Sequence, residues 1–244
     1  VGIVIYMAVE GLTDTNIFTQ IISVITIIMI LDWRMQQRHE NMQYQQNIQY
    51  VLRDLGNSDA ISGMRGAREA RAMGLLTDQS LEGADLQYAN LAGADLSYAH
   101  LQRANLASAD MTGTRLWGAD LSIADFSDAV MPGTDLTNAN LASAGFWGCD
   151  LRGANLSGAC LHTANLDEAQ FDENTVLPDA KPVQRSADGA TIYDRYWTPA
   201  TDMTRYTDMD HAEFWEPVWA EEGYDSFHAW DRSRYLVSTP PKSS

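Results

Sequence analysis

The chain has 244 residues and a formal net charge of −17, from 16 basic and 33 acidic side chains. This length suffices for one or two domains with a core of their own. The acidic balance argues against direct nucleic-acid binding, which needs Lys and Arg clustered against the phosphates. With two cysteines and no CxxC motif, the sequence signals neither a disulfide framework nor a zinc site.

Residues 1–33 are predicted to form a membrane hairpin whose first helix is truncated. The chain begins with Val rather than Met, and residues 1–9 are apolar, as the end of a shortened helix would be. Residues 17–31 carry no charge and, with their flanks, approach the ~20 residues that span a bilayer. Arg34 and Arg38 follow directly, which places the C-terminal side in the cytoplasm. A hydrophobic hairpin buried against a partner or in a dimer is the alternative.

Residues 34–78 are predicted to form a juxtamembrane stalk and N-terminal capping helices. The polar stalk helix is expected to end near Gly56. Its thin apolar seam leaves both a short coiled coil and a solvated stalk open; the seam consists of Met35, Met42, Ile48, Val51, Leu52 and Leu55.

A second short helix follows the stalk. Ser58 or Asp59 can cap its start and Gly74 its end. Its apolar side chains are expected to close the first coil of the region that follows; they are Ile61, Met64 and Met73.

The centre of the chain has a period of five, which is the period of neither a helix nor a strand. From Ala84 to Glu173 the sequence divides without a slip into eighteen blocks, which begin ADLQY, ANLAG, ADLSY. The third position of every block is Leu, Met or Phe. The first position is Ala, except at Thr114, Thr134 and Cys149.

This pattern resembles the pentapeptide-repeat family, and the resemblance covers the whole of the repeated segment. It implies a right-handed, four-sided β-helix, in which each block forms one side, four blocks form a coil, and the first and third positions point inward. A narrow tube has room for Ala, Thr or Cys at its corners, and one Leu-sized group per side fills the axis. A single block cannot bury its apolar residue, so the coils must stack. The predicted fold class is therefore β, a pentapeptide-repeat solenoid over residues 79–173.

Residues twenty apart should then lie one above another. Phe126 and Phe146 would stack in adjacent coils on one side. Four glycines twenty residues apart suggest a turn with positive φ along one edge; they are Gly93, Gly113, Gly133 and Gly153. Cys149 takes an inward position and Cys160 an outward, surface position on another side, so both are expected to be free thiols.

Residues 174–236 are predicted to form a C-terminal cap and residues 237–244 a disordered tail. The first of these segments is too rich in aromatic residues for a disordered chain. Asp210 and Glu213 are a capping pair for a short helix through Phe214, with Pro217 near its end. The aromatic side chains either cover the last coil or form a docking surface for a partner.

No catalytic, cofactor-binding or metal site is predicted. His211 lies beside Asp208 and Asp210, but one His with acids at a helix start is better explained by capping than by metal binding. His100 and His162 occupy outward repeat positions with no acid or base partner implied. The recurrent Asp at the second repeat position is attributed to solvation of that position.

The sequence therefore favours a non-enzymatic, membrane-tethered scaffold that presents a rigid β-helix to a cytoplasmic protein partner. The partner is unknown and would bind the acidic outer faces or the C-terminal aromatics; oligomers are compatible with this function. One alternative is a DNA mimic, because some members of the family protect DNA gyrase by imitating the acidic duplex. Another is the regulatory domain of a membrane channel or transporter.

Overall fold

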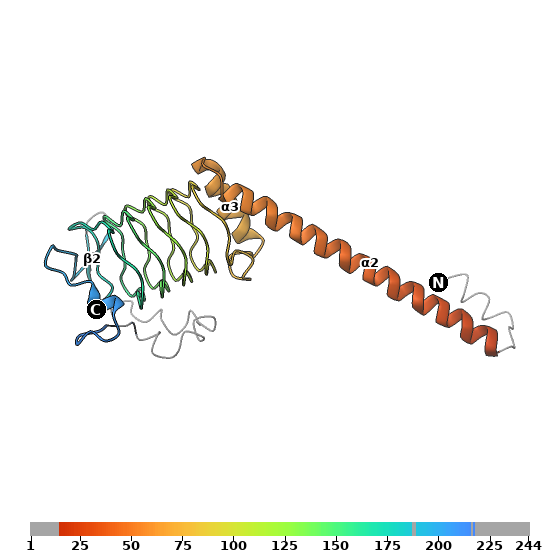
Figure 1. Cartoon of the computed structure of the whole chain (residues 1–244). Coiled ribbons are helices and arrows are strands. Elements are labelled where there is room, and N and C mark those ends of the chain that lie inside the picture. Colours follow the sequence, from red (N-terminus) through yellow and green to blue (C-terminus); the bar gives the residue numbers. More distant parts are fainter. Residues whose placement is uncertain (1–14, 187–188, 216, 218–244) are drawn as a thin grey trace, which may run out of the picture. The chain divides into compact units, whose positions relative to one another are not determined.

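The computed structural model describes residues 15–186, 189–215 and 217, with the side chains of residues 15–18 excepted. The elements are α2 (Thr15–Leu55), α3 (Ala60–Ala72), β1 (Pro182–Arg185), β2 (Thr191–Tyr193) and α4 (Thr204–Thr207) (Figure 1). The chain divides into two compact units, Val1–Gln49 and Tyr50–Ser244. All the features discussed from α3 onward belong to the second unit.

Helix α2 runs without a break through the predicted second membrane segment and the predicted stalk. Its apolar residues Ile22, Ile27 and Leu31 are exposed. In the part of the chain that the structure describes, no helix combines the length and the apolar character needed to cross a membrane. The predicted first membrane segment, residues 1–9, lies outside the described residues.

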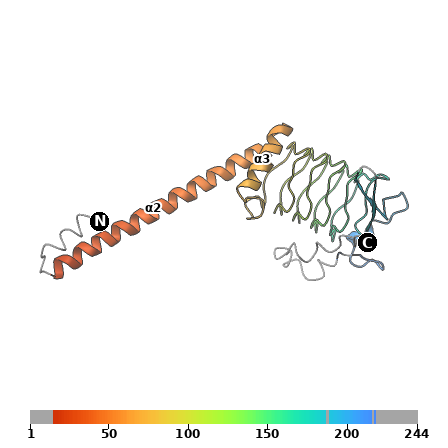
Figure 2. The same cartoon turned by 180° about the vertical axis from the view of Figure 1, so that it is seen from behind.

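Between α3 and β1 the chain winds into a column of stacked coils (Figures 1 and 2). Parallel bridges join residues twenty apart, from Asp85↔Asn105 to Asp150↔Gln170. The predicted repeat of four blocks per coil is therefore confirmed. We call the four sides face 1 to face 4, after the blocks that begin at Ala84, Ala89, Ala94 and Ala99, together with all blocks that follow each of them at multiples of 20 residues.

The axis of the column is filled by the third-position side chains, nearly all of which are fully buried. The rings of Phe126 and Phe146 stack with centroids 4.9 Å apart and planes 4° apart, as predicted. The two inward threonines do not leave a polar group unpaired, because Thr114 Oγ1 donates to the Leu91 carbonyl (2.7 Å) and Thr134 Oγ1 to the Met111 carbonyl (2.8 Å).

Each corner of the column is a β-turn with its third residue in the left-handed region. The first-position N–H of each block donates to the third-position carbonyl of the block before, as from Ala84 to Leu81 (3.1 Å). The residue between them in fifth position has φ from 54° to 71°, at all eighteen corners from 83 to 168. This is the geometry of a type II turn. The predicted glycine edge, which includes Gly113, is thus one of four equivalent edges with positive φ. Ten of the eighteen corners have a residue other than glycine in this conformation.

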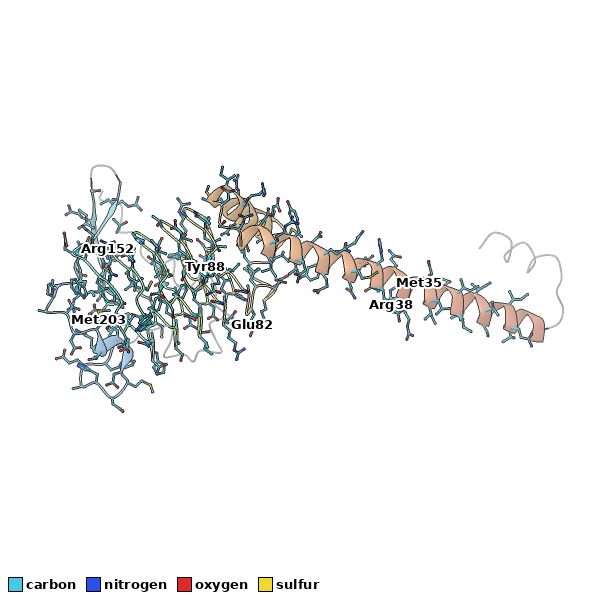
Figure 3. The ribbon with its side chains drawn as sticks, turned by 45° about the horizontal axis from the view of Figure 1, so that its top comes forward. Met35, Arg38, Glu82, Tyr88, Arg152 and Met203 are labelled. Atoms are coloured by element: carbon cyan, nitrogen blue, oxygen red, sulfur yellow. The ribbon has the colours of Figure 1, made fainter. Side chains whose placement is uncertain are left out.

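The second-position side chain has a structural role that solvation does not explain. Wherever this residue is Asp or Asn, its Oδ1 accepts a hydrogen bond from the N–H two residues on, as from Ser127 to Asp125 (2.9 Å). The same contact occurs in twelve blocks. The Asx side chain therefore accepts from the fourth-position N–H, which has no acceptor in the neighbouring coils. The fourth and fifth positions themselves point outward, as Arg152 and Tyr88 do (Figure 3).

Helix α3 lies against the first coil. Asp59 caps its start by accepting from Ser62 N (3.0 Å), and Gly74, with φ 77°, follows its end. The predicted covering face is wrong for Ile61 and Met73, which are exposed, whereas Met64 is half-buried and lies beside Gly93. Small residues cover the coil instead: a side chain at Gly63 would collide with the Asn90 carbonyl. Close approach of the helix backbone thus replaces a large apolar face.

The C-terminal end of the column is closed by a returning segment. Val176 continues face 3 by pairing in parallel with Asn155, and it also pairs antiparallel with Tyr196. The antiparallel partner ends the parallel stacking, which limits edge-to-edge association. Trp197 stacks on Phe171 with centroids 5.9 Å apart. The predicted helix through Phe214 is wrong, since residues 208–215 form turns and the short helix α4 precedes them.

Replacing Phe126 by Ala is expected to destabilise the column by about 3–5 kcal/mol, because the change removes a stacked ring and leaves a cavity that the coils cannot close. Urea denaturation followed by circular dichroism measures the loss. The exposed Gln87→Ala is the control and should change stability by less than about 0.5 kcal/mol. A loss below about 1 kcal/mol for Phe126→Ala would show that the axis is not tightly packed.

Replacing Ile123 by Gly is expected to stabilise the protein by about 0.5–1 kcal/mol. Ile123 is exposed and β-branched, yet its φ is 62°. Relief of about 1–2 kcal/mol of backbone strain exceeds the entropy that Gly gains on unfolding. Val130→Gly is the matched control at an exposed position outside the left-handed region, and it should lower the melting temperature. Equal losses in both variants would refute the assignment of strain to the corner.

Candidate interaction surface

A groove of about 400 Å³ lies on face 3, beside the β1–β2 hairpin. Two aromatic residues, Trp117 from the column and Tyr193 from β2, line it. The other lining residues come from the corner before face 3, from two face 3 blocks in adjacent coils and from β2; they are Gly133, Asp135, Thr137, Asn155 and Thr191. The volume is in the range of small-ligand and side-chain pockets.

The carboxylate of Asp135 is fixed in place by the local turn. Its Oδ1 accepts from the N–H of Thr137 (3.0 Å) and from Thr137 Oγ1 (2.6 Å). Its Oδ2 receives no hydrogen bond from the part of the chain that the structure describes. The block thus presents one carboxylate oxygen and one hydroxyl oxygen as acceptors with fixed positions.

The opposite wall depends on a contact between the column and the hairpin. Asn155 Nδ2 donates to the Tyr193 hydroxyl (2.9 Å), and Asn155 Oδ1 accepts from Ser157 N (3.1 Å). Tyr193 N in turn donates to the hydroxyl of Tyr196 (3.1 Å). The hairpin is therefore held against face 3 by side chains of the last coil.

Trp117 stands where the repeat departs from its own pattern. Its block, TRLWG, has Arg115 in the second position, so it lacks the hydrogen bond from the fourth-position N–H to an Asp or Asn side chain that most other blocks form. The indole packs edge to face with Tyr98, at a centroid distance of 4.6 Å and an interplanar angle of 87°. The block AGFWG on face 1 departs from the pattern in the same way, with Gly145 and Trp147, so what distinguishes Trp117 is its place in the groove beside the hairpin.

The acidic second positions elsewhere are partly neutralised within the protein. Arg152 donates to Asp150, and this bond is the main reason why the pKa of Asp150 lies below its usual range. Burial raises the pKa of Asp95, but hydrogen bonds from Ser97 and the charges of Arg71 and Arg115 outweigh it and hold the pKa low. The acids on the column are therefore local structural partners rather than a uniform row of free charges.

The histidines considered in the sequence do not converge on a reactive centre. His211 Nδ1 accepts from Glu213 N (3.0 Å), and its Nε2 lies 3.2 Å from Asp202 Oδ2. His162 packs against Phe214 with ring centroids 6.1 Å apart. Within the described ranges, no group of three or more His, Cys, Asp or Glu side chains is placed to hold a metal ion.

Both cysteines are free thiols and both are buried. Burial raises the pKa of the Cys149 thiol far above its ordinary value. Cys160 was expected at the surface because it occupies an outward position, but only 1% of it is exposed. That expectation is wrong, since face 4 is covered at this level.

The family described as Pentapeptide repeats matches the chain in eight copies, over residues 80–118, 119–158 and 134–172. The chain belongs to the pentapeptide-repeat family. The repeat column is the four-sided β-helix of that family, and the third-position Leu, Met and Phe are its axial residues. A comparison with curated proteins gives no match.

Several solved pentapeptide-repeat structures are similar to the chain. Rfr23 from the cyanobacterium Cyanothece 51142 is 36% identical over 39% of this chain and 61% of its own, with a TM-score of 0.21. HetL from Nostoc sp. strain PCC 7120, a protein involved in heterocyst differentiation regulation, is 32% identical over 41% and 55%, with a TM-score of 0.24. The protein alr5209 from Nostoc PCC 7120 is 32% identical over 45% and 84%, with a TM-score of 0.21.

The chain spans less than two thirds of the length of the first two of these relatives. TM-scores this low do not support a transfer of function from any of them.

The groove was not predicted from the sequence. The only signal in the repeats is a tryptophan in the fourth position of the block TRLWG, and the block AGFWG on face 1 carries the same signal without the groove. The hairpin that supplies Tyr193 and Thr191 lies beyond the repeats, so no periodicity could place it on face 3.

Proposed function

We propose that the protein is a non-catalytic interaction module that binds a protein partner through the face 3 groove. The observation that carries this proposal is the arrangement of Trp117, Asp135 and Tyr193 around one groove on a rigid column. Pentapeptide-repeat proteins in general are structural and interaction proteins, which agrees with this function.

The column lowers the entropic cost of binding. Each side is tied to its neighbours by backbone hydrogen bonds, as in Leu116 N to the Asp135 carbonyl (2.8 Å) and Asp135 N to the Thr114 carbonyl (2.9 Å). Side chains on such a frame need little ordering when a partner binds, so more of the contact energy appears as affinity.

The same frame argues against imitation of a DNA duplex. A mimic needs a regular row of negative charge, whereas the second positions of face 3 are Asp95, Arg115, Asp135 and Asn155. Twelve second-position Asx residues in the column also accept hydrogen bonds from their own blocks, which explains their recurrence without any external partner.

The module is further proposed to act at a membrane, with the repeats on the cytoplasmic side. This proposal is supported by the absence of charge from residues 17–31 and by the position of Arg34 and Arg38 directly after them. The exposure of Ile22, Ile27 and Leu31 on α2 gives this segment apolar surface for lipid to cover.

Affinity capture with the full chain in detergent tests the interaction. Trp117→Ala is expected to lose a partner that the unaltered protein retains, because the variant removes one wall of the groove. Trp147→Ala is the matched control, since Trp147 is also in a fourth position but on face 1, and it should retain the partner. Capture of the same proteins by both variants would exclude the groove as the binding surface.

Membrane association is tested by centrifugation of cell lysates. The full chain is expected in the membrane pellet, and Ile27→Arg combined with Ile28→Arg should release most of it, because each buried charge disfavours insertion. Met42→Arg is the control, as it is an exposed apolar position in the polar part of α2. Recovery of the unaltered chain in the supernatant would remove the tether from the proposal.

A further inference from the structure

We propose that the groove on face 3 receives the guanidinium group of an arginine side chain of the partner. This inference rests on the proposed interaction function and specifies the chemistry of the ligand. It follows from three properties of the groove: the hydrogen-bonding character of its floor, the nature of its wall, and the charge of the surrounding chain.

The floor calls for hydrogen-bond donors. Asp135 Oδ1 accepts both hydrogen bonds from Thr137, so Oδ2 is the carboxylate oxygen that remains available to a ligand in the groove. Thr137 Oγ1 donates its hydrogen bond to Asp135, so it can only accept further hydrogen bonds. The Tyr193 hydroxyl oxygen accepts a hydrogen bond from Asn155 Nδ2, and its own O–H can still donate. A guanidinium has five N–H donors and no acceptor, so it matches the Asp135 carboxylate and the neighbouring Thr137 hydroxyl oxygen, both of which can accept.

The wall favours a planar cation. Trp117 is the aromatic side chain with the strongest attraction for cations, and arginine is the cation that most often stacks on it. The contact with Tyr98 restricts the orientation of the indole, so the wall is preformed. An ammonium group would gain the charge attraction but not the stacking or the forked hydrogen bonds.

The negative net charge of the protein favours the binding of a cation, but one positively charged residue lies beside Asp135. The net charge of −17 attracts basic partners. Arg115 is the exception, because it is the second-position neighbour of Asp135 in the coil below. Its charge also acts on Asp95, whose pKa is held low by several groups that include it. Removal of the Arg115 charge should therefore strengthen the binding of a guanidinium.

The test is a titration of the full chain in detergent, labelled with ¹⁵N at tryptophan. The probe is N-acetyl-arginine methylamide, and the observed signal is the Trp117 indole N–H, identified as the resonance that disappears in Trp117→Phe. The probe is expected to shift this signal in a saturable manner. The citrulline analogue, which has the same shape without the charge, should not.

Three variants sharpen the result. Asp135→Asn should weaken the binding about tenfold, as expected for the loss of one charge-assisted hydrogen bond, while Arg115→Gln should strengthen it severalfold. Asp125→Asn is the control for the first, since Asp125 makes the same turn contacts with Ser127 on face 1. Asn keeps the turn, because Asn105 and Asn140 accept the same hydrogen bond elsewhere in the column.

An unchanged Trp117 signal, an equal response to citrulline, or equal effects of Asp135→Asn and Asp125→Asn would overturn the inference. Equal binding of the lysine analogue would overturn the preference for a planar group. If the titration fails while Trp117→Ala still loses its partner, the ligand chemistry is wrong and the interaction function stands. If Trp117→Ala retains every partner, the interaction function fails whatever the titration gives.

Discussion

The column depends on hydrogen-bond acceptors for the five backbone N–H groups of a pentapeptide. The first closes the corner turn, the second donates to the coil before, and the third and fifth donate to the coil after. The fourth donates to the second-position Asp or Asn side chain in twelve blocks. Six blocks lack an Asp or Asn in this position, so the contact stabilises the column without being required in every block. A net gain of about 0.5–1.5 kcal/mol is typical of such a hydrogen bond.

This requirement explains which parts of the fold could be predicted from the sequence. The axial residues follow from period and size alone, and the stack of Phe126 on Phe146 was predicted from their separation. The role of the second position was not, because a carboxylate that binds its own backbone and a solvated carboxylate give the same composition. Positive φ at Ile123 and Thr163 also escaped prediction, since β-branched residues normally avoid it.

The ends and the groove were beyond the reach of the repeat because they depend on contacts distant in sequence. The capping residues Asp59 and Gly74 predict the bounds of α3 correctly. Hydrophobicity alone does not predict which side of α3 covers the first coil, because small size matters there. Gly63 is small because the Asn90 carbonyl is close, and only the folded structure shows that carbonyl. The same holds for Tyr193, whose place beside Asn155 is set by the hairpin.

The column has a filled interior and turns at all its corners, so the repeats alone form no cleft. A binding surface therefore forms where the repeat pattern is interrupted or where another segment packs against the column. Both conditions meet on face 3. Arg115 and Trp117 break the pattern of their block, and β2 adds a second wall. Asp135 keeps the pattern and so remains rigid. A rigid acceptor in a groove that Trp117 and Tyr193 also line selects a ligand by geometry as well as by charge, which the acidic surface alone could not do.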